Sequence, residues 1–114
     1  MSYDCIYIAG PMRGIPGMNH TAFHEAEERL TALGYVVINP ARIEDEFSGV
    51  DWAGCLRRDI ALIVTRCQTL AVLPGWEHSR GASLEVHIAR ALGMKVIELD
   101  NVPAAPGLTG DRRP

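Results

Sequence analysis

Four short apolar runs alternate with segments of helical periodicity, and this alternation constrains the fold more than any other feature of the sequence. The apolar runs are DCIYIA (4–9), YVVIN (35–39), TLAVLP (69–74) and KVIELD (95–100). Runs of this length, bounded by Gly and Pro, are typical of buried strands. Strands that alternate with helices form βαβ units, which build a parallel sheet with helices on both faces. The sequence therefore predicts a small, doubly wound α/β fold.

Three helices are predicted between the strands. The first spans 21–33, where apolar residues recur at spacings of three and four: Phe23, Ala26, Leu30 and Leu33. The second runs from Trp52 to about Arg66, with Asp51 as its N-cap. The third begins within the stretch GWEHSRGASLEV (75–86) and ends near Leu92, with Gly93 as its stop. Residues 40–50 are polar and irregular, and no helix is predicted there.

The chain has 114 residues, the usual size of one domain. We expect an α/β domain over 1–101, followed by a Pro- and Gly-rich tail over 102–114 that is loosely ordered unless a partner subunit holds it. The net charge of -3 argues against a nucleic-acid polymer as partner. No run of eighteen apolar residues is present, so no membrane span is expected. The start lacks the basic region of a signal peptide, and the three cysteines have no CxxC spacing, which together favour a cytoplasmic protein with reduced thiols.

A carboxylate falls on the apolar stripe of the third predicted helix. The inward series reads Ala82, Glu85, Ala89 and Leu92, at spacings of three, four and three. Burial of a carboxylate is costly unless a partner satisfies it or a reaction uses it. Glu85 is therefore either a functional group in a cleft or a residue near the helix start that the helix dipole or solvent stabilises.

Other candidates lie near the ends of the strands, where doubly wound sheets bind their ligands. The loop GPMRG (10–14) allows close backbone approach, with Arg13 as a charged arm, or it is only a turn. Ser79 is either a phosphate ligand or a plain N-cap, and Gly81 leaves space beside it. Asp59 follows two arginines and is either functional or part of a solvated face. His20 and His24 lack further ligands, so no metal and no cofactor are predicted.

Three segments, YIAGPMRG, RRDI and GWEHSRGASLEVHIARALGMKVI, resemble the nucleoside 2-deoxyribosyltransferase-like superfamily over roughly residues 4–98. Within it, the chain is similar to the deoxynucleoside 5'-monophosphate N-glycosidases. The resemblance implies a flavodoxin-like (Rossmann-like) parallel sheet, usually of five strands where four are readable here, and a homodimer. It also implies a small nucleotide as substrate.

The resemblance gives roles to individual residues. Glu85 matches the nucleophile that attacks the anomeric carbon and displaces the base, Asp59 matches an acid that assists the base or orients the nucleophile, and Tyr7 matches a tyrosine that bonds the nucleophile. Arg13 and Ser79 match phosphate-binding positions of the relatives, and the expected substrate-binding residues are Gly10, Met12, Arg13, Gly14, Ser79 and Gly81. Pro11 replaces a phosphate-contacting serine of the relatives.

The expected function is hydrolysis of the N-glycosidic bond of a (deoxy)nucleoside 5'-monophosphate through a glycosyl intermediate on Glu85. A base-exchanging transferase and a non-catalytic nucleotide-binding module are the alternatives. Cleavage of such a bond passes through an oxocarbenium-like state, which a nearby carboxylate stabilises and can trap.

Overall fold

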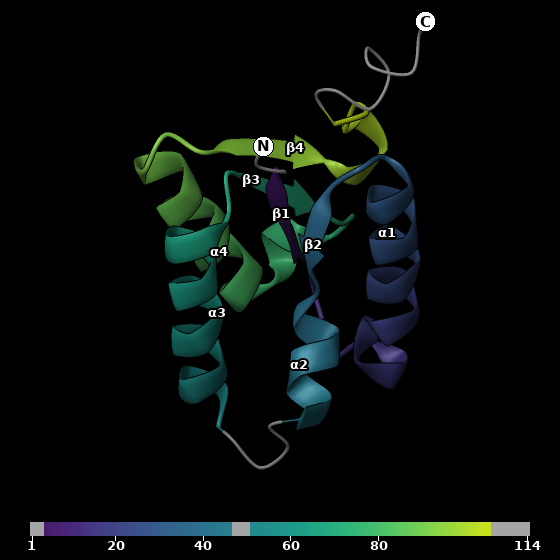
Figure 1. Cartoon of the computed structure of the whole chain (residues 1–114). Helices are drawn as coiled ribbons and strands as arrows, with labels where there is room; N and C mark the ends of the chain where they lie inside the picture. Colours follow the sequence, from purple (N-terminus) through teal and green to yellow (C-terminus); the bar gives the residue numbers. More distant parts are fainter. Residues whose placement is uncertain (1–3, 47–50, 106–114) are drawn as a thin grey trace, which may run out of the picture.

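The computed structural model describes residues 4–46 and 51–105. Its centre is a sheet of four parallel strands in the order β2-β1-β3-β4 (Figure 1). The strands are β1 (Cys5–Ala9), β2 (Val36–Ile38), β3 (Thr69–Val72) and β4 (Lys95–Glu98). On the central strand, Tyr7 pairs with Ile38 on one side and with Leu70 on the other. The predicted flavodoxin-like α/β fold is confirmed, and the order of strands reverses between β1 and β3.

The helices cover both faces of this sheet (Figure 1). Helix α1 (His20–Ala32) lies on one face, and α3 (Trp52–Arg66) and α4 (Arg80–Ala91) lie on the other. Side chains of a strand point alternately to the two faces. On β1, Ile6 and Ile8 therefore pack on the α1 side, while Tyr7 packs on the side of α3 and α4. Short 3-10 helices complete the described part of the chain: η1 (Pro16–Asn19), η2 (Trp76–His78) and η3 (Leu99–Asn101).

One helix was not predicted. The segment α2 (Pro40–Glu46) is helical, although its polar composition suggested an irregular loop. Asn39 begins it as a capping residue, since its Oδ1 accepts a hydrogen bond from the backbone N–H of Ala41 at 3.0 Å. Pro40 then occupies the first helical position, where a missing N–H costs nothing. A proline that was expected only to close β2 thus also starts a helix.

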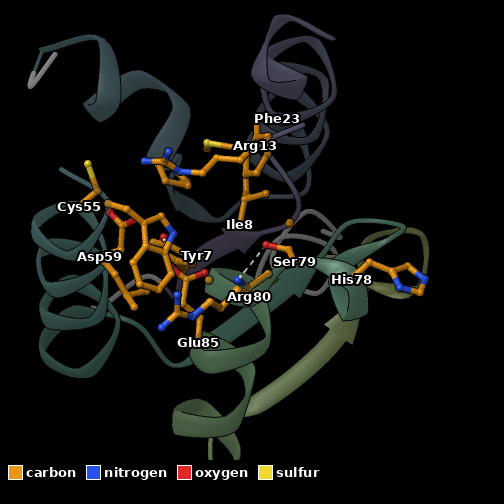
Figure 2. Close-up of a pocket in the computed structure, with 17 residues that line it drawn as sticks. Tyr7, Ile8, Arg13, Phe23, Cys55, Asp59, His78, Ser79, Arg80 and Glu85 are labelled. Carbon is orange, nitrogen blue, oxygen red and sulfur yellow. Dashed lines mark hydrogen bonds between the residues drawn. The ribbon is translucent and has the colours of Figure 1, made fainter. Parts of the chain in front are cut away.

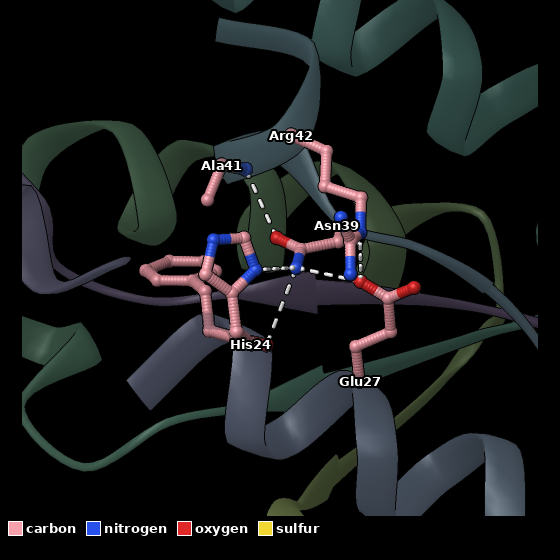
Figure 3. A network of polar contacts seen from close by, with 6 residues as sticks. His24, Glu27, Asn39, Ala41 and Arg42 are labelled. Atoms are coloured by element: carbon pink, nitrogen blue, oxygen red, sulfur yellow. Dashed lines mark hydrogen bonds and ion pairs between the residues drawn. The ribbon is translucent and has the colours of Figure 1, made fainter. Parts of the chain in front are cut away.

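Asn39 also fixes α2 to α1 (Figure 3). Its buried amide nitrogen lies 2.9 Å from Glu27 Oε1 and 3.2 Å from His24 Nδ1. Arg42 of α2 donates to the same Glu27 oxygen at 2.6 Å. Burial alone would raise the pKa of Glu27, but the hydrogen bonds from Asn39 and Arg42 outweigh it, so the pKa is lowered. This network places Pro40, which lines the cleft described below.

The beginning of the tail is ordered, contrary to expectation. Val102 and Ala105 are buried, and Val102 joins the core on the α1 face. The N–H of Ala105 donates to the carbonyl of Leu33 at 2.8 Å, and the Tyr35 hydroxyl donates to the carbonyl of Pro103 at 2.8 Å. The expected boundary at 101 therefore falls before the last residues that pack on the domain, and the rest of the tail lies outside the described residues.

Among the described residues, no helix combines the length and the apolar character needed to cross a membrane. Cys5 and Cys67 are buried, with their Sγ atoms 3.5 Å apart, and both contribute to the core on the side of α3 and α4. Cys5 and Cys67 therefore serve as packing residues, whereas Cys55 is only partly buried.

Candidate active site

A cleft of about 460 Å³ opens at the carboxyl ends of β1 and β3, where the strand order reverses (Figure 2). Its volume is within the range of small-molecule sites. The first loop, α3 and the N-terminus of α4 form its walls. Eight of the predicted site residues line it: Tyr7, Gly10, Met12, Arg13, Asp59, Ser79, Gly81 and Glu85. Segments far apart in the sequence are thus brought to one site.

Glu85 is the most deeply placed carboxylate of this cleft. Glu85 is only 6% exposed. Ala82 and Ala89, which belong to the same predicted apolar stripe of α4, are also buried, and this confirms the inward face that the periodicity predicted. Leu92 was expected on this stripe but is 58% exposed, because α4 ends at Ala91 and the chain turns at Gly93. The Tyr7 hydroxyl donates a hydrogen bond of 2.9 Å to Glu85 Oε2.

The surroundings of Glu85 favour its protonated form. Burial and the neighbouring Asp59 carboxylate raise the pKa of Glu85 to about 8, against the smaller lowering effects of the Tyr7 hydrogen bond and the Arg58 charge. A residue that solvent or the helix dipole stabilised would not be shifted in this direction. The 6% exposure of Glu85 contradicts stabilisation by solvent, and its place as the sixth residue of α4 puts it beyond the first turn, where the helix dipole acts.

Asp59 is also buried, at 7% exposure, so its interpretation as part of a solvated face is wrong. Arg58 donates to its Oδ1 from Nη2 at 2.7 Å and from Nε at 3.0 Å. This pair was not predicted, because adjacent residues on a helix do not normally face each other. Here the long guanidinium side chain of Arg58 folds back along α3 and reaches the carboxylate of its neighbour.

Tyr7 connects the central strand to the two acids. Its side chain is fully buried. Burial raises the pKa of the Tyr7 hydroxyl well above its usual value, and the carboxyl groups of Glu85 and Asp59 raise it further. Tyr7 therefore remains a neutral hydrogen-bond donor throughout the physiological pH range.

The first loop approaches the sheet closely at one glycine only. A Cβ atom on Gly10 would lie 2.8 Å from Cβ of Leu73, which a side chain cannot tolerate without movement. Gly14 was predicted with Gly10 as a substrate-binding position, but it is exposed and does not line the cleft. The φ of Gly14 is 85°, a backbone conformation that favours glycine, and this accounts for a glycine at this position.

Gly10→Ala is expected to lower the free energy of unfolding by about 1–3 kcal/mol, the usual cost of overpacking a core. The Leu73 side chain that it would strike is buried and cannot move into solvent. Urea unfolding measures the effect. Gly81→Ala is the matched control, because its Cβ would meet only Trp52 Nε1 at 3.8 Å, and alanine is favoured over glycine in a helix. Wild-type stability in Gly10→Ala would show that the contact is not restrictive.

The N-terminus of α4 carries polar groups into the cleft. The Ser79 hydroxyl accepts a hydrogen bond from the N–H of Ala82 at 3.2 Å, so Ser79 is an N-cap, and it also lines the cleft. The guanidinium carbon of Arg80 lies 4.4 Å from the centre of the Trp52 ring. His78 borders the cleft, but its ring points away from Glu85 (Figure 2). Trp52 was not predicted as a site residue, because its position at the start of a helix gave no sign of the cleft.

Residues 4–46 and 51–105 contain no group of three or more His, Cys, Asp or Glu side chains placed to hold a metal ion. His20 and His24 contact each other edge to face, with ring centres 5.9 Å apart.

The fold and the cleft define a flavodoxin-like α/β protein with two buried carboxyl groups at the reversal point of a parallel sheet. The chain belongs to the family described as Domain of unknown function (DUF4406), whose model matches residues 4–98. The matched region contains all four strands and every residue of the site. No curated protein matches the chain.

Proposed function

We propose that this protein is an N-glycosidase that hydrolyses the N-glycosidic bond of a (deoxy)nucleoside 5'-monophosphate, with Glu85 as nucleophile. The observation that carries the proposal is the Glu85 carboxyl group, buried in the cleft and held by Tyr7, with Asp59 as its neighbour. The resemblance of residues 4–98 to the nucleoside 2-deoxyribosyltransferase-like superfamily supports the substrate class.

In the proposed reaction, Glu85 acts as the carboxylate. One of its oxygens bonds to the anomeric carbon, while the bond from that carbon to the base nitrogen breaks. The base leaves with the electron pair and takes up one proton, for which Asp59 is the neighbouring relay. Water then attacks the same carbon, gives up a proton, and releases the sugar phosphate and the free Glu85 carboxylate.

The positive charges of the cleft support a phosphorylated substrate. Arg13 from the first loop and Arg80 from α4 both line the cleft and are exposed at it. Ser79 uses a lone pair of its hydroxyl to cap α4, so its hydroxyl hydrogen remains to donate to a phosphate oxygen. Capping and phosphate binding are therefore compatible functions of this one side chain.

A nucleotide-binding module without turnover is the second candidate, and one observation favours it. With a pKa of about 8, Glu85 is mainly protonated at neutral pH and is then a poor nucleophile. Base exchange is the third candidate function, because a second base can attack the glycosyl intermediate in place of water once the original base has left.

The deciding experiment measures base release from each common ribo- and deoxyribonucleoside 5'-monophosphate, including 5-hydroxymethylated pyrimidines, with and without a second base. Chromatography separates free base, sugar phosphate and exchanged nucleotide. Free base without an acceptor supports hydrolysis and identifies the substrate. Product only when a second base is present favours the transferase. Binding without any product favours the module.

Tyr7→Phe is expected to slow base release by about 10–100-fold, the worth of one hydrogen bond to a charged group. The Tyr7 hydrogen bond lowers the pKa of Glu85, so its loss raises that pKa. The rise of kcat/KM with pH, expected near pH 8 in the wild type, then shifts to higher pH. Tyr35→Phe is the control, since that hydroxyl bonds Pro103 outside the cleft. An unchanged pH profile in Tyr7→Phe would contradict the role given to Tyr7.

Two further properties rest on the resemblance and on the composition. We infer a homodimer, which sedimentation equilibrium would report as twice the chain mass of 12.5 kDa. We also infer a cytoplasmic location, in keeping with the core positions of Cys5 and Cys67. Cell fractionation tests it directly.

A further inference from the structure

Arg80 covers one face of an aromatic ring inside the cleft. Its guanidinium carbon lies 4.4 Å from the centre of the Trp52 ring, and both side chains line the cleft. Trp52 is the first residue of α3, and Arg80 is the first residue of α4. The pair therefore bridges the two helices. Arg80 is exposed and Trp52 is half-buried, so the cation can leave the ring without unpacking the core.

Trp52 belongs to a wall that leads directly to the two acids. Trp52, Leu56 and Asp59 follow one another at spacings of four and three on α3, and all line the cleft. Asp59 is at the buried end of this wall and Trp52 is at its half-buried end. Asp59 is also the carboxylate whose charge acts on Glu85, so this wall begins beside the proposed nucleophile.

We propose that Trp52 is the stacking surface for the nucleobase, and that Arg80 is an exchangeable cover which the 5'-phosphate of the substrate removes. This inference rests on the proposed function, because it takes a nucleoside 5'-monophosphate as the ligand. A guanidinium over an indole at a partly exposed site is held weakly, whereas a charge-assisted, bidentate bond to a phosphate is strong. The phosphate therefore draws Arg80 from the ring, and the base occupies the vacated face.

The exchange has a consequence for specificity. A nucleoside without phosphate must displace Arg80 and offers it no new partner. A nucleotide gives Arg80 the stronger partner and gains the stacking surface together. The phosphate thus acts as a condition for binding the base, and the cleft selects nucleotides over nucleosides by more than the phosphate contact alone.

Fluorescence of Trp52 tests the exchange. The chain has two tryptophans, so Trp76→Phe leaves Trp52 as the single emitter. Ribose 5-phosphate is expected to increase the quenching of Trp52 by acrylamide, because Arg80 leaves the ring. A nucleoside 5'-monophosphate is expected to quench the emission itself and to protect the ring from acrylamide. The matching nucleoside has neither effect at the same concentration.

Removal of Arg80 should reduce the preference for nucleotide over nucleoside, while Arg13 and Ser79 still line the cleft. We expect the wild-type protein to bind the nucleotide at least about tenfold more tightly than the nucleoside, because Arg80 makes one charge-assisted contact with the phosphate. In Arg80→Ala, nucleoside binding improves, nucleotide binding weakens, and the ring is open to acrylamide without ligand. Arg90→Ala is the matched control, because Arg90 lies 5.7 Å from the centre of the Trp76 ring and neither residue lines the cleft.

Fluorine NMR of protein labelled with 5-fluorotryptophan reports both rings in the unmutated chain, so the test does not depend on Trp76→Phe folding. Ligand-dependent shifts of Trp52 alone support the inference. Base release from a nucleotide that leaves the Trp52 signal unchanged overturns it and preserves the proposed function. A ligand-dependent shift of Trp52 without base release supports the stacking role of Trp52 and overturns the N-glycosidase function. A chain that shows neither a Trp52 shift nor base release overturns both proposals.

Discussion

Replacement of Glu85 by Gln is expected to reduce base release by at least about 10³-fold while nucleotide binding persists, as is found when a nucleophile is removed from an otherwise intact site. Glutamine has the size of glutamate and still accepts the hydrogen bond that Tyr7 donates at 2.9 Å in the wild type. It lacks the anionic oxygen that forms the glycosyl ester. The fold should therefore remain, and only the covalent step should be lost.

The experiment compares wild type, Glu85→Gln and Glu77→Gln by chromatographic base release, and compares their nucleotide affinities by calorimetry. Glu77 is an exposed carboxylate of η2 that does not line the cleft, so it controls for loss of one negative charge near α4. Circular dichroism verifies folding. Turnover of Glu85→Gln within about tenfold of the wild type would remove Glu85 from the nucleophile role, because loss of a nucleophile costs far more.

The second large effect concerns stability: we expect Glu85 to lower the free energy of unfolding as pH rises. The pKa of Glu85 is about 8 in the folded chain and near 4.5 in the unfolded one. Between these pH values the folded state holds one proton more than the unfolded state, so stability is greatest below the lower value and is lost as pH rises through 8. Across pH 5–8 the unfolding equilibrium changes by up to about a thousandfold, or about 4 kcal/mol.

Urea unfolding of wild type and Glu85→Gln at unit pH intervals measures this contribution as the difference between the two proteins. The lowered pKa of Glu27 affects stability only at more acid pH, and the raised pKa of Tyr7 affects it only above pH 10, so neither interferes. The free energy of unfolding of Glu85→Gln should rise relative to that of the wild type as pH rises. Parallel curves across the window would show that Glu85 is not buried in its protonated form.

Much of the fold could be predicted because the relevant patterns are local. The apolar runs gave the four strands, and the caps at Asp51 and Ser79 marked the starts of α3 and α4. The segment α2 was missed because its first turn depends on Asn39, whose amide is held by His24 and Glu27 of another helix. Its own composition carried no amphipathic pattern.

The candidate site was predicted in its members but not in its interactions. The inward position of Glu85 followed from helical spacing. Asp59 and Tyr7 were assigned to the same site because they match functional residues of the superfamily that the chain resembles. The contacts of Arg58 with Asp59 and of Arg80 with Trp52 were not foreseen. Each depends on how a long arginine side chain folds against its surroundings, which sequence spacing does not specify.

The sequence by itself determined the alternation of strands and helices and the face of α4 that carries Glu85. These follow from periodicity and from local backbone preference. Only the tertiary structure decided the chemical state of the site. The pKa of Glu85 depends on burial and on groups from β1 and α3, which are distant in sequence and meet only when the sheet and its helices assemble.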